Sequence, residues 1–184
     1  MSRQASRLLS VTRWWQSARA RTRLAIGAIV VIVIGLGGLT PNVLFDVTLS
    51  WPYAALIAAV GWGRSGLGFG PMTLLLVFGL AQDVTASAPI GSFALINFAT
   101  FGASAALSQT FDIERSPGMN YGLPLVLLAF GMVLVWLLAS FASGHVVRIV
   151  PLFSALLATV FLHMLIAPLF DLGIRRGGPA GAGL

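Results

Sequence analysis

The residues best suited to chemistry gather in one short polar segment between two apolar runs. Gln82 and Asp83 follow an almost unbroken apolar run over residues 72–80, and Pro89 and Gly91 precede a second apolar run that carries no charge. An ionised carboxylate at the centre of a bilayer costs about 3 kcal/mol on insertion scales. In a chain this apolar, Asp83 is therefore expected near a membrane face or inside a cavity lined by protein.

The carboxylate of Asp83 has two interpretations. As a functional group it could accept hydrogen bonds from a partner helix or bind a cation. As a structural group it would accept hydrogen bonds from backbone N–H groups of the following turn and of the next helix, and we favour this interpretation. Pro89 disfavours helix at Ala88 and suits the start of a new helix. We expect a helical hairpin whose polar hinge consists of Gly79, Gln82, Asp83, Pro89 and Gly91.

The remaining residues with chemical potential do not form a recognisable active site. Ser143 and His145 are neighbours in a short turn, where side chains rarely converge, and no carboxylate orients the imidazole. His163 lies too far along the chain from His145 for a helical metal pair, so we expect a hydrogen-bonded histidine inside the fold. The motifs of serine hydrolases and zinc peptidases are missing, and there is no cysteine. The sequence predicts no enzymatic activity, no cofactor and no metal.

The composition excludes an ordinary water-soluble domain. Of the 184 residues 58% are hydrophobic and only 9% are charged, whereas about a quarter are charged in soluble domains. Long apolar runs without strand-type alternation predict spanning helices rather than a barrel. The length suits about six spans of roughly 20 residues. We therefore expect an all-α integral membrane protein, a compact bundle of six transmembrane helices.

The chain divides into a leader, a transmembrane domain and a tail. Residues 1–23 form a basic leader with six arginines and no acidic residue, which would be either an interfacial amphipathic helix or a disordered segment. We favour an uncleaved first span over a signal peptide. Residues 24–170 form the transmembrane domain, and residues 171–184 form a flexible, glycine-rich tail. The expected spans are residues 24–39, 52–62, 69–81, 90–107, 123–141 and 151–169.

The fourth expected span has the features of a helix inside a bundle. Ser92, Ile96, Thr100, Ser104 and Ser108 recur at every fourth position and so share one line of the helix. Small and hydroxyl side chains let helix backbones approach closely in lipid. Side chains expected to pack as intramembrane polar groups are Asn97, Thr100, Ser104 and His163.

The arginines set the expected orientation. With the N-terminus inside, the leader, the turn at Arg64, the loop at Arg115 and the tail place ten arginines in the cytoplasm, and only Arg148 lies outside. Both termini are therefore expected to be cytoplasmic, with Asp83 near the outer face. The basic excess is a topology signal and does not indicate nucleic acid.

The hinge resembles the rod-shape-determining protein MreD family. That family carries a run of the form Gly-Leu-Leu-Gln-Asp-Leu, then small polar residues, Pro-Leu-Gly and an apolar helix. Residues 79–84 and 89–91 of this chain are similar to it position by position. Pro52 at the start of a span and the Trp62-Gly-Arg64 exit also look similar to the family layout. The resemblance covers about residues 50–108.

The resemblance implies a six-helix component of the bacterial inner membrane that assembles or regulates lateral peptidoglycan synthesis and cell shape without catalysis. The partners it implies are an MreC-like bitopic scaffold, a RodA-like glycan polymerase, an elongation-specific penicillin-binding transpeptidase and an MreB-like actin filament. The family fold also looks like the solute-binding subunits of energy-coupling-factor transporters. A solute-binding membrane subunit is therefore the alternative, with a cavity lined by Asp83, Asn97, the hydroxyls of the fourth span and the region of Trp51 and Tyr53.

Overall fold

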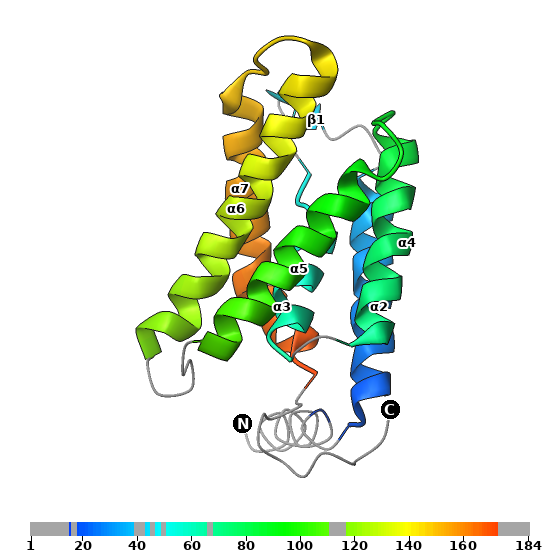
Figure 1. Cartoon of the computed structure of the whole chain (residues 1–184), viewed down its shortest axis with the longest axis vertical. Coiled ribbons are helices and arrows are strands. Elements are labelled where there is room, and N and C mark those ends of the chain that lie inside the picture. The colour runs from blue at the N-terminus through cyan, green and yellow to red at the C-terminus, as the bar shows by residue number, and fades with distance from the viewer. Residues whose placement is uncertain are drawn as a thin grey trace.

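The structure, a computed structural model, describes Trp15 and residues 18–38, 43–44, 47–48, 51–65, 68–110 and 117–172. These residues form six α-helices packed as an elongated bundle (Figure 1). The all-helical fold class is confirmed. In chain order the helices are α2 (Ala20–Gly37), α3 (Ala54–Gly63), α4 (Phe69–Thr85), α5 (Ser92–Thr110), α6 (Pro117–Ser143), α7 (Ile149–Ile166) and the short 3-10 helix η2 (Ala167–Phe170).

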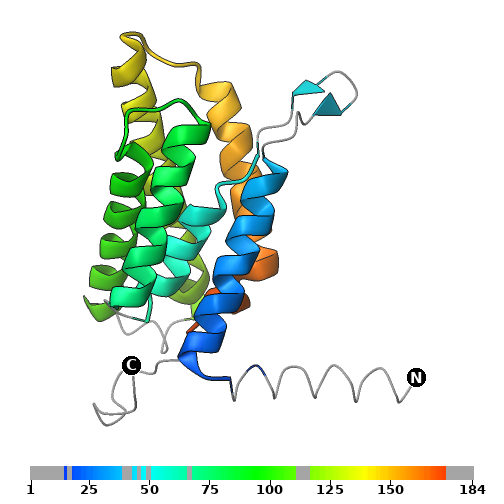
Figure 2. The ribbon, with the colours of Figure 1, turned by 90° about the vertical axis from the view of Figure 1, so that its right-hand side faces the viewer.

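Two very short strands lie between α2 and α3. Strand β1 (Val43–Leu44) pairs antiparallel with β2 (Val47–Thr48), and Val43 is opposite Thr48. This hairpin lies to the side of the bundle (Figure 2). The sequence does not predict it, because two-residue strands leave no alternation of apolar and polar residues to detect.

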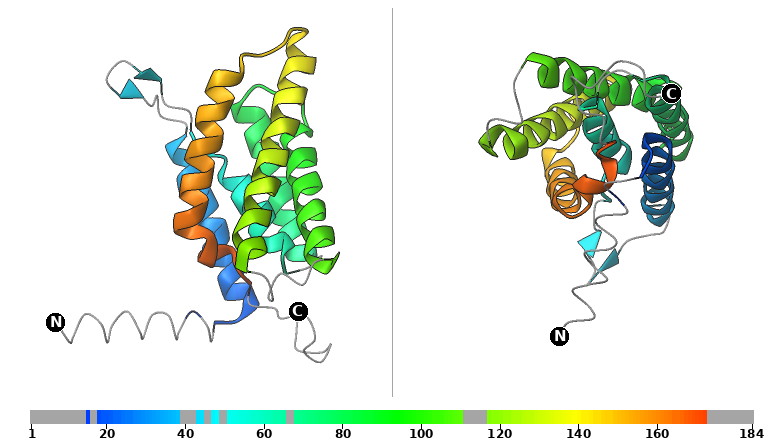
Figure 3. Two further views of the ribbon diagram at one scale, coloured as in Figure 1. Left: turned by 90° about the vertical axis from the view of Figure 1, so that its left-hand side faces the viewer. Right: turned by 90° about the horizontal axis from the view of Figure 1, so that it is seen from below.

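Helix α3 is the centre of the bundle. All ten of its residues are buried, and it contacts every other helix, η2 included. Seen from below in Figure 3, the other helices surround it. It carries no charged side chain, so it can be enclosed on all sides. Ten residues rise only about 15 Å, half of a hydrocarbon layer of about 30 Å. The expected second span is therefore a half-length helix.

The outer surface of the bundle is apolar. Large apolar side chains are exposed along α2, α4, α6 and α7, among them Phe69 at 88% and Phe161 at 74%. Three helical segments, Ala20–Gly37, Tyr121–Ser143 and Ile149–Phe170, are long and apolar enough to cross a membrane. An apolar exterior of this extent is typical of a protein surrounded by lipid.

Successive helices run in alternate directions (Figures 1 and 2). The start of α2, the turn at Arg64, the start of α6 and η2 lie at one end, which we call the proximal end. The turn over residues 86–91 and the turn between α6 and α7 lie at the opposite end, which we call the hinge end. The fold therefore returns to the end where α2 begins.

Both extremities of the described chain are joined at the proximal end. The indole Nε1 of Trp15 donates a hydrogen bond to the carbonyl of Pro168 at 3.1 Å. The Arg23 guanidinium donates to the carbonyl of Asp171 at 3.2 Å and lies 5.5 Å from the Trp15 ring. Residues 20–23, expected in the leader, belong to α2. Residues 1–14, 16–17 and 173–184 of the expected leader and tail lie outside the described residues.

The helix boundaries differ from the expected spans mainly at the ends. Helix α4 extends past residue 81, so Asp83 lies in its last turn and does not follow it. Helix α6 begins at Pro117 rather than at residue 123. Proline suits the first turn of a helix, where its missing N–H has no intrahelical role. Hydropathy identifies the part of a helix that suits lipid, so it does not predict how far a helix continues into polar residues at its ends.

Candidate functional site: the Asp83 hinge and its neighbouring pocket

Asp83 joins the end of α4 to the start of α5. Its side chain is only 1% exposed. Oδ2 accepts a hydrogen bond from the N–H of Gly91, and Oδ1 accepts one from the N–H of Phe93, both at 2.7 Å. The first N–H groups of a helix have no intrahelical acceptor, and the helix dipole favours a negative charge beside them. These are the hydrogen bonds that the structural interpretation of Asp83 predicts.

The backbone of the same residue closes α4. The N–H of Ala88 donates to the carbonyl of Asp83 at 2.9 Å, and the N–H of Ser87 donates to the carbonyl of Val84 at 3.4 Å. Ser87 has a φ of +51°, the left-handed conformation. This pattern is a Schellman motif with serine where glycine is commoner. The backbone carbonyl of Asp83 therefore takes part in the C-terminal cap of α4, and its carboxylate accepts hydrogen bonds at the start of α5.

Two hinge glycines meet different steric requirements. Gly91 has a φ of +93°, which residues with a Cβ rarely adopt. A Cβ on Gly79 would overlap the backbone Cα and N of Ala94 on α5. Helices α4 and α5 therefore cross backbone to backbone one turn before Asp83. Pro89 lies exposed in the turn between these two helices.

Polar side chains of α5 tie it to its neighbours. The buried Asn97 donates from Nδ2 to Oε1 of Gln82 on α4 at 3.4 Å. The buried hydroxyl of Ser104 donates to the carbonyl of Val60 on α3 at 2.8 Å. A Cβ on Gly63 would lie 2.6 Å from the Ser104 Cβ, so α3 also approaches α5 closely. As the four-residue spacing predicts, Ser92, Ile96, Thr100 and Ser104 are all buried.

Not all of the expected site residues meet at the hinge. Thr100 lies buried further along α5, and its Oγ1 has no hydrogen-bond partner in the described part of the chain. His163 lies in the last turn of α7 and is buried as expected, but the hydrogen bond expected for it is not found at Nδ1, which has no partner among those residues. The hinge cluster proper is therefore Gly79, Gln82, Asp83, Gly91 and Asn97, with Pro89 on the turn.

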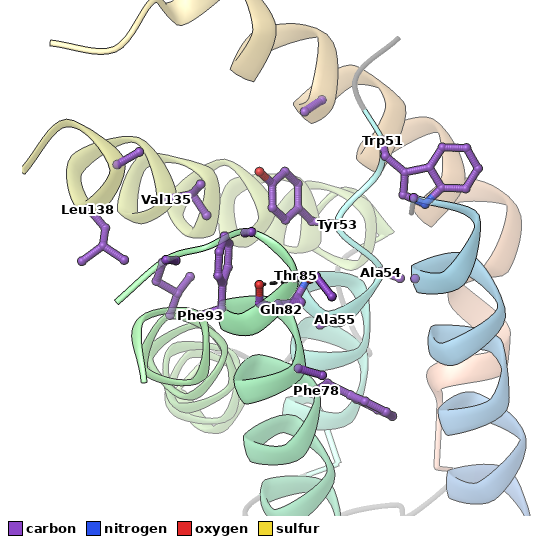
Figure 4. A pocket seen from close by; sticks show the side chains of 18 of the residues that line it. Trp51, Tyr53, Ala54, Ala55, Phe78, Gln82, Thr85, Phe93, Val135 and Leu138 are labelled. Carbon is purple, nitrogen blue, oxygen red and sulfur yellow. Dashed lines mark hydrogen bonds between the residues drawn. The ribbon is translucent and has the colours of Figure 1, made fainter. Parts of the chain in front are cut away.

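A pocket of about 980 Å³ lies beside the hinge. Helices α2, α4, α6 and α7, the starts of α3 and α5 and the segment before α3 supply its walls, and none of the described residues that line it is charged. Trp51 and Tyr53 line it, as expected for a solute cavity, but Asp83, Asn97 and the α5 hydroxyls do not. The Asp83 carboxylate is turned to the α5 backbone instead, and Gln82 faces the pocket (Figure 4).

Sequence reasoning missed the residue that holds the segment before α3. The N–H of Tyr53 donates to Oγ1 of Thr159 on α7 at 3.0 Å, and that hydroxyl donates to the carbonyl of Ala155 at 2.6 Å. Thr159 is completely buried. The signal for it was a threonine in the otherwise apolar stretch over residues 155–162. This contact fixes the point at which the chain enters the bundle.

The chain matches no protein-family model, no curated protein and no solved structure.

Proposed function

We propose that the protein is a non-catalytic component of the bacterial inner membrane that assembles or regulates lateral peptidoglycan synthesis, as the resemblance of its hinge to the MreD family implies. The observation that carries the proposal is that residues of the MreD-like motif have structural roles. Gly79, Asp83 and Gly91 are all engaged in holding α4 against α5. A motif devoted to structure suits a protein that presents helix surfaces to partners rather than one that turns over a substrate.

We further propose a multi-pass topology of six passes with both termini in the cytoplasm. The alternating helix directions support it, as does the position of Arg64 at the proximal end, where the arginine-rich start of α2 also lies. Helix α3 and the extended segment before it would form one pass together. Extended backbone is tolerated at membrane depth where protein encloses it or where it lines a cavity.

Partner crosslinking tests the proposed function. A photoreactive residue would replace Val77 on α4 or Leu95 on α5, which are 54% and 67% exposed, in full-length protein in its own membranes. The expected product is a crosslink to a single-span scaffold with a periplasmic coiled coil, or to the glycan polymerase. Folded protein that captures neither partner from either helix, in cells that contain both, would refute the proposal.

The pocket favours a second candidate function, the solute-binding subunit of an energy-coupling-factor-type transporter. Its volume of about 980 Å³ lies near the top of the usual range for small-molecule sites, about 300–1,000 Å³. Mass spectrometry of the protein purified in a mild detergent tests this candidate. One retained vitamin-like molecule per chain, together with co-purifying ATPase subunits, would favour transport over assembly.

A further inference from the structure

Several hydrogen-bond donors on the pocket wall, among them those of Tyr53, Gln82 and Ala55, have no partner in the described residues. The Tyr53 hydroxyl makes no hydrogen bond. Gln82 uses its Oε1 to accept from Asn97, which leaves its amide Nε2 without a partner. The N–H of Ala55, in the first turn of α3, also has none. The pocket therefore presents unused donors from two segments of the fold.

Apart from the Ser87 hydroxyl, which has no partner in the described residues, the other polar side chains on the wall are satisfied within the protein. The Trp51 indole donates to the carbonyl of Ile34 at 2.6 Å, and the Thr85 hydroxyl donates to the carbonyl of Gln82 at 3.1 Å. The Ser143 hydroxyl donates to the carbonyl of His145 at 3.0 Å. The Tyr53 and Gln82 side chains are half-buried, so a ligand with an acceptor oxygen can replace water as the partner of their donors.

The remaining lining residues indicate the polarity and charge of the ligand. Phe78, Phe93, Ile96, Val135 and Leu138 give the pocket an apolar lining, and none of the described lining residues is acidic and able to receive a cation. Figure 4 shows Tyr53, Gln82 and Phe93 at the same pocket. The start of α3 adds a positive dipole end, which also disfavours a cation. The ligand is therefore apolar over most of its length and neutral or negative at its polar end.

The wall formed by α2 shows where such a ligand enters. Ile32 and Leu36 line the pocket, and they are also 48% and 58% exposed on the outer apolar surface. The pocket lining is thus continuous with the surface that faces lipid. A long aliphatic molecule can pass from the bilayer into the pocket without crossing a polar barrier.

We propose that this pocket binds an amphiphile with one long aliphatic chain and a carboxylate or ester carbonyl group. The oxygen accepts a hydrogen bond from the Tyr53 hydroxyl, and the chain lies against Phe93 and Val135. A free fatty acid and the acyl ester of a membrane lipid share this chemistry. The site depends on the pocket and not on the proposed assembly function, so its failure would leave partner crosslinking unaffected.

Native mass spectrometry of the delipidated full-length protein in a maltoside detergent tests the proposal. The probes are palmitate, methyl palmitate and heptadecane, which carry a carboxylate, an ester carbonyl and no acceptor. We expect one palmitate or methyl palmitate per chain and distinctly weaker heptadecane binding. Tighter binding of palmitate identifies a free acid as the natural class of ligand, and tighter binding of methyl palmitate identifies a lipid ester.

Two variants and two matched controls make the test specific. Tyr53→Phe removes a hydroxyl that makes no hydrogen bond to the described residues, so the fold should persist and affinity should fall about three- to tenfold. Ala139→Trp fills the pocket from α6 and should abolish the one-to-one complex. Tyr121→Phe and Ala106→Trp change residues that do not line the pocket and should leave binding unchanged.

The same measurements can overturn the proposal. Equal binding of heptadecane and both palmitate probes would show that no acceptor oxygen is recognised. Undiminished palmitate and methyl palmitate binding to Tyr53→Phe would show that its hydroxyl is not used. Undiminished binding to a folded Ala139→Trp would place the ligand on the outer surface. If Ala139→Trp does not fold, Tyr53→Phe and the heptadecane comparison decide the matter.

Discussion

Asp83 and Phe93 are joined by a hydrogen bond of 2.7 Å between the carboxylate of one and the backbone N–H of the other, from the last turn of α4 to the first turn of α5. This bond links two helices that cross one turn away, where Gly79 meets Ala94. A charged side chain in an apolar bundle is thus stabilised by backbone donors that would otherwise lack acceptors. The hinge is a rigid corner, and the predictions below concern its parts and the elements it positions.

Replacement of Asp83 should destabilise the protein in proportion to the acceptors removed. Asp83→Ala leaves two N–H groups without acceptors and should cost about 2–4 kcal/mol, and Asp83→Asn, which keeps one acceptor oxygen, should cost less. Thermal unfolding of the purified protein measures both. If Asp83→Asn matches the wild type in stability, partner crosslinking and cell shape, the negative charge is not required.

Gly79→Ala should separate α4 from α5. The added Cβ would overlap backbone atoms of Ala94, and backbone cannot yield as a flexible side chain can, so a loss of about 1–3 kcal/mol or more is expected. Gly102→Ala on α5 is the matched control, since its Cβ would meet nothing within 4 Å. The control should be neutral or slightly stabilising. Equal effects of the two substitutions on the unfolding temperature would contradict the close crossing.

Ser87→Gly should stabilise the protein. Ser87 has a φ of +51°, a conformation that costs a residue with a Cβ about 1 kcal/mol and glycine almost nothing. Its neighbour Ala86 has a φ of −88°, so Ala86→Gly should bring no gain. A higher unfolding temperature for Ser87→Gly alone is the expected pattern. A lower one would count against the Schellman geometry.

Thr159→Val should loosen the segment that leads into α3. The substitution preserves shape but removes the acceptor of the Tyr53 N–H, and an unsatisfied buried donor costs about 1–3 kcal/mol. Thr159→Ser keeps the hydroxyl and should cost less. Hydrogen exchange at Tyr53 should be faster in the valine variant. Unchanged exchange would mean that the contact with α7 does not hold this segment.

The sequence predicts the parts of this fold that have a local physical signature. Apolar runs mark the helices, the four-residue spacing from Ser92 to Ser104 identifies the buried line of α5, and Asp83 before Pro89 indicates a capped hairpin. What depends on tertiary packing could not be read in advance. Nothing local to residues 54–63 says that α3 is central, and the pocket exists only because six helices and the segment before α3 meet around it.

The polar ends of helices and the pairing of very short strands also could not be predicted, for related reasons. The start of α6 at Pro117 lies in a stretch without strong apolarity, and two-residue strands have no period. Gln82 lines the pocket and Asp83 does not, because the two side chains point in different directions from the last turn of α4. The sequence places both residues at the end of the apolar run but does not determine which of them meets α5.

The most direct test of the account is the side of the membrane on which the hinge lies. The chain has no cysteine, so a single cysteine replacing Ala86 at the hinge, or Ser65 at the proximal end, can be labelled alone. A membrane-impermeant maleimide applied to spheroplasts should label the protein carrying Ala86→Cys and should reach Ser65→Cys only after lysis. Labelling of Ser65→Cys in intact spheroplasts, with Ala86→Cys protected until lysis, would contradict the proposed topology and the outward-facing hinge.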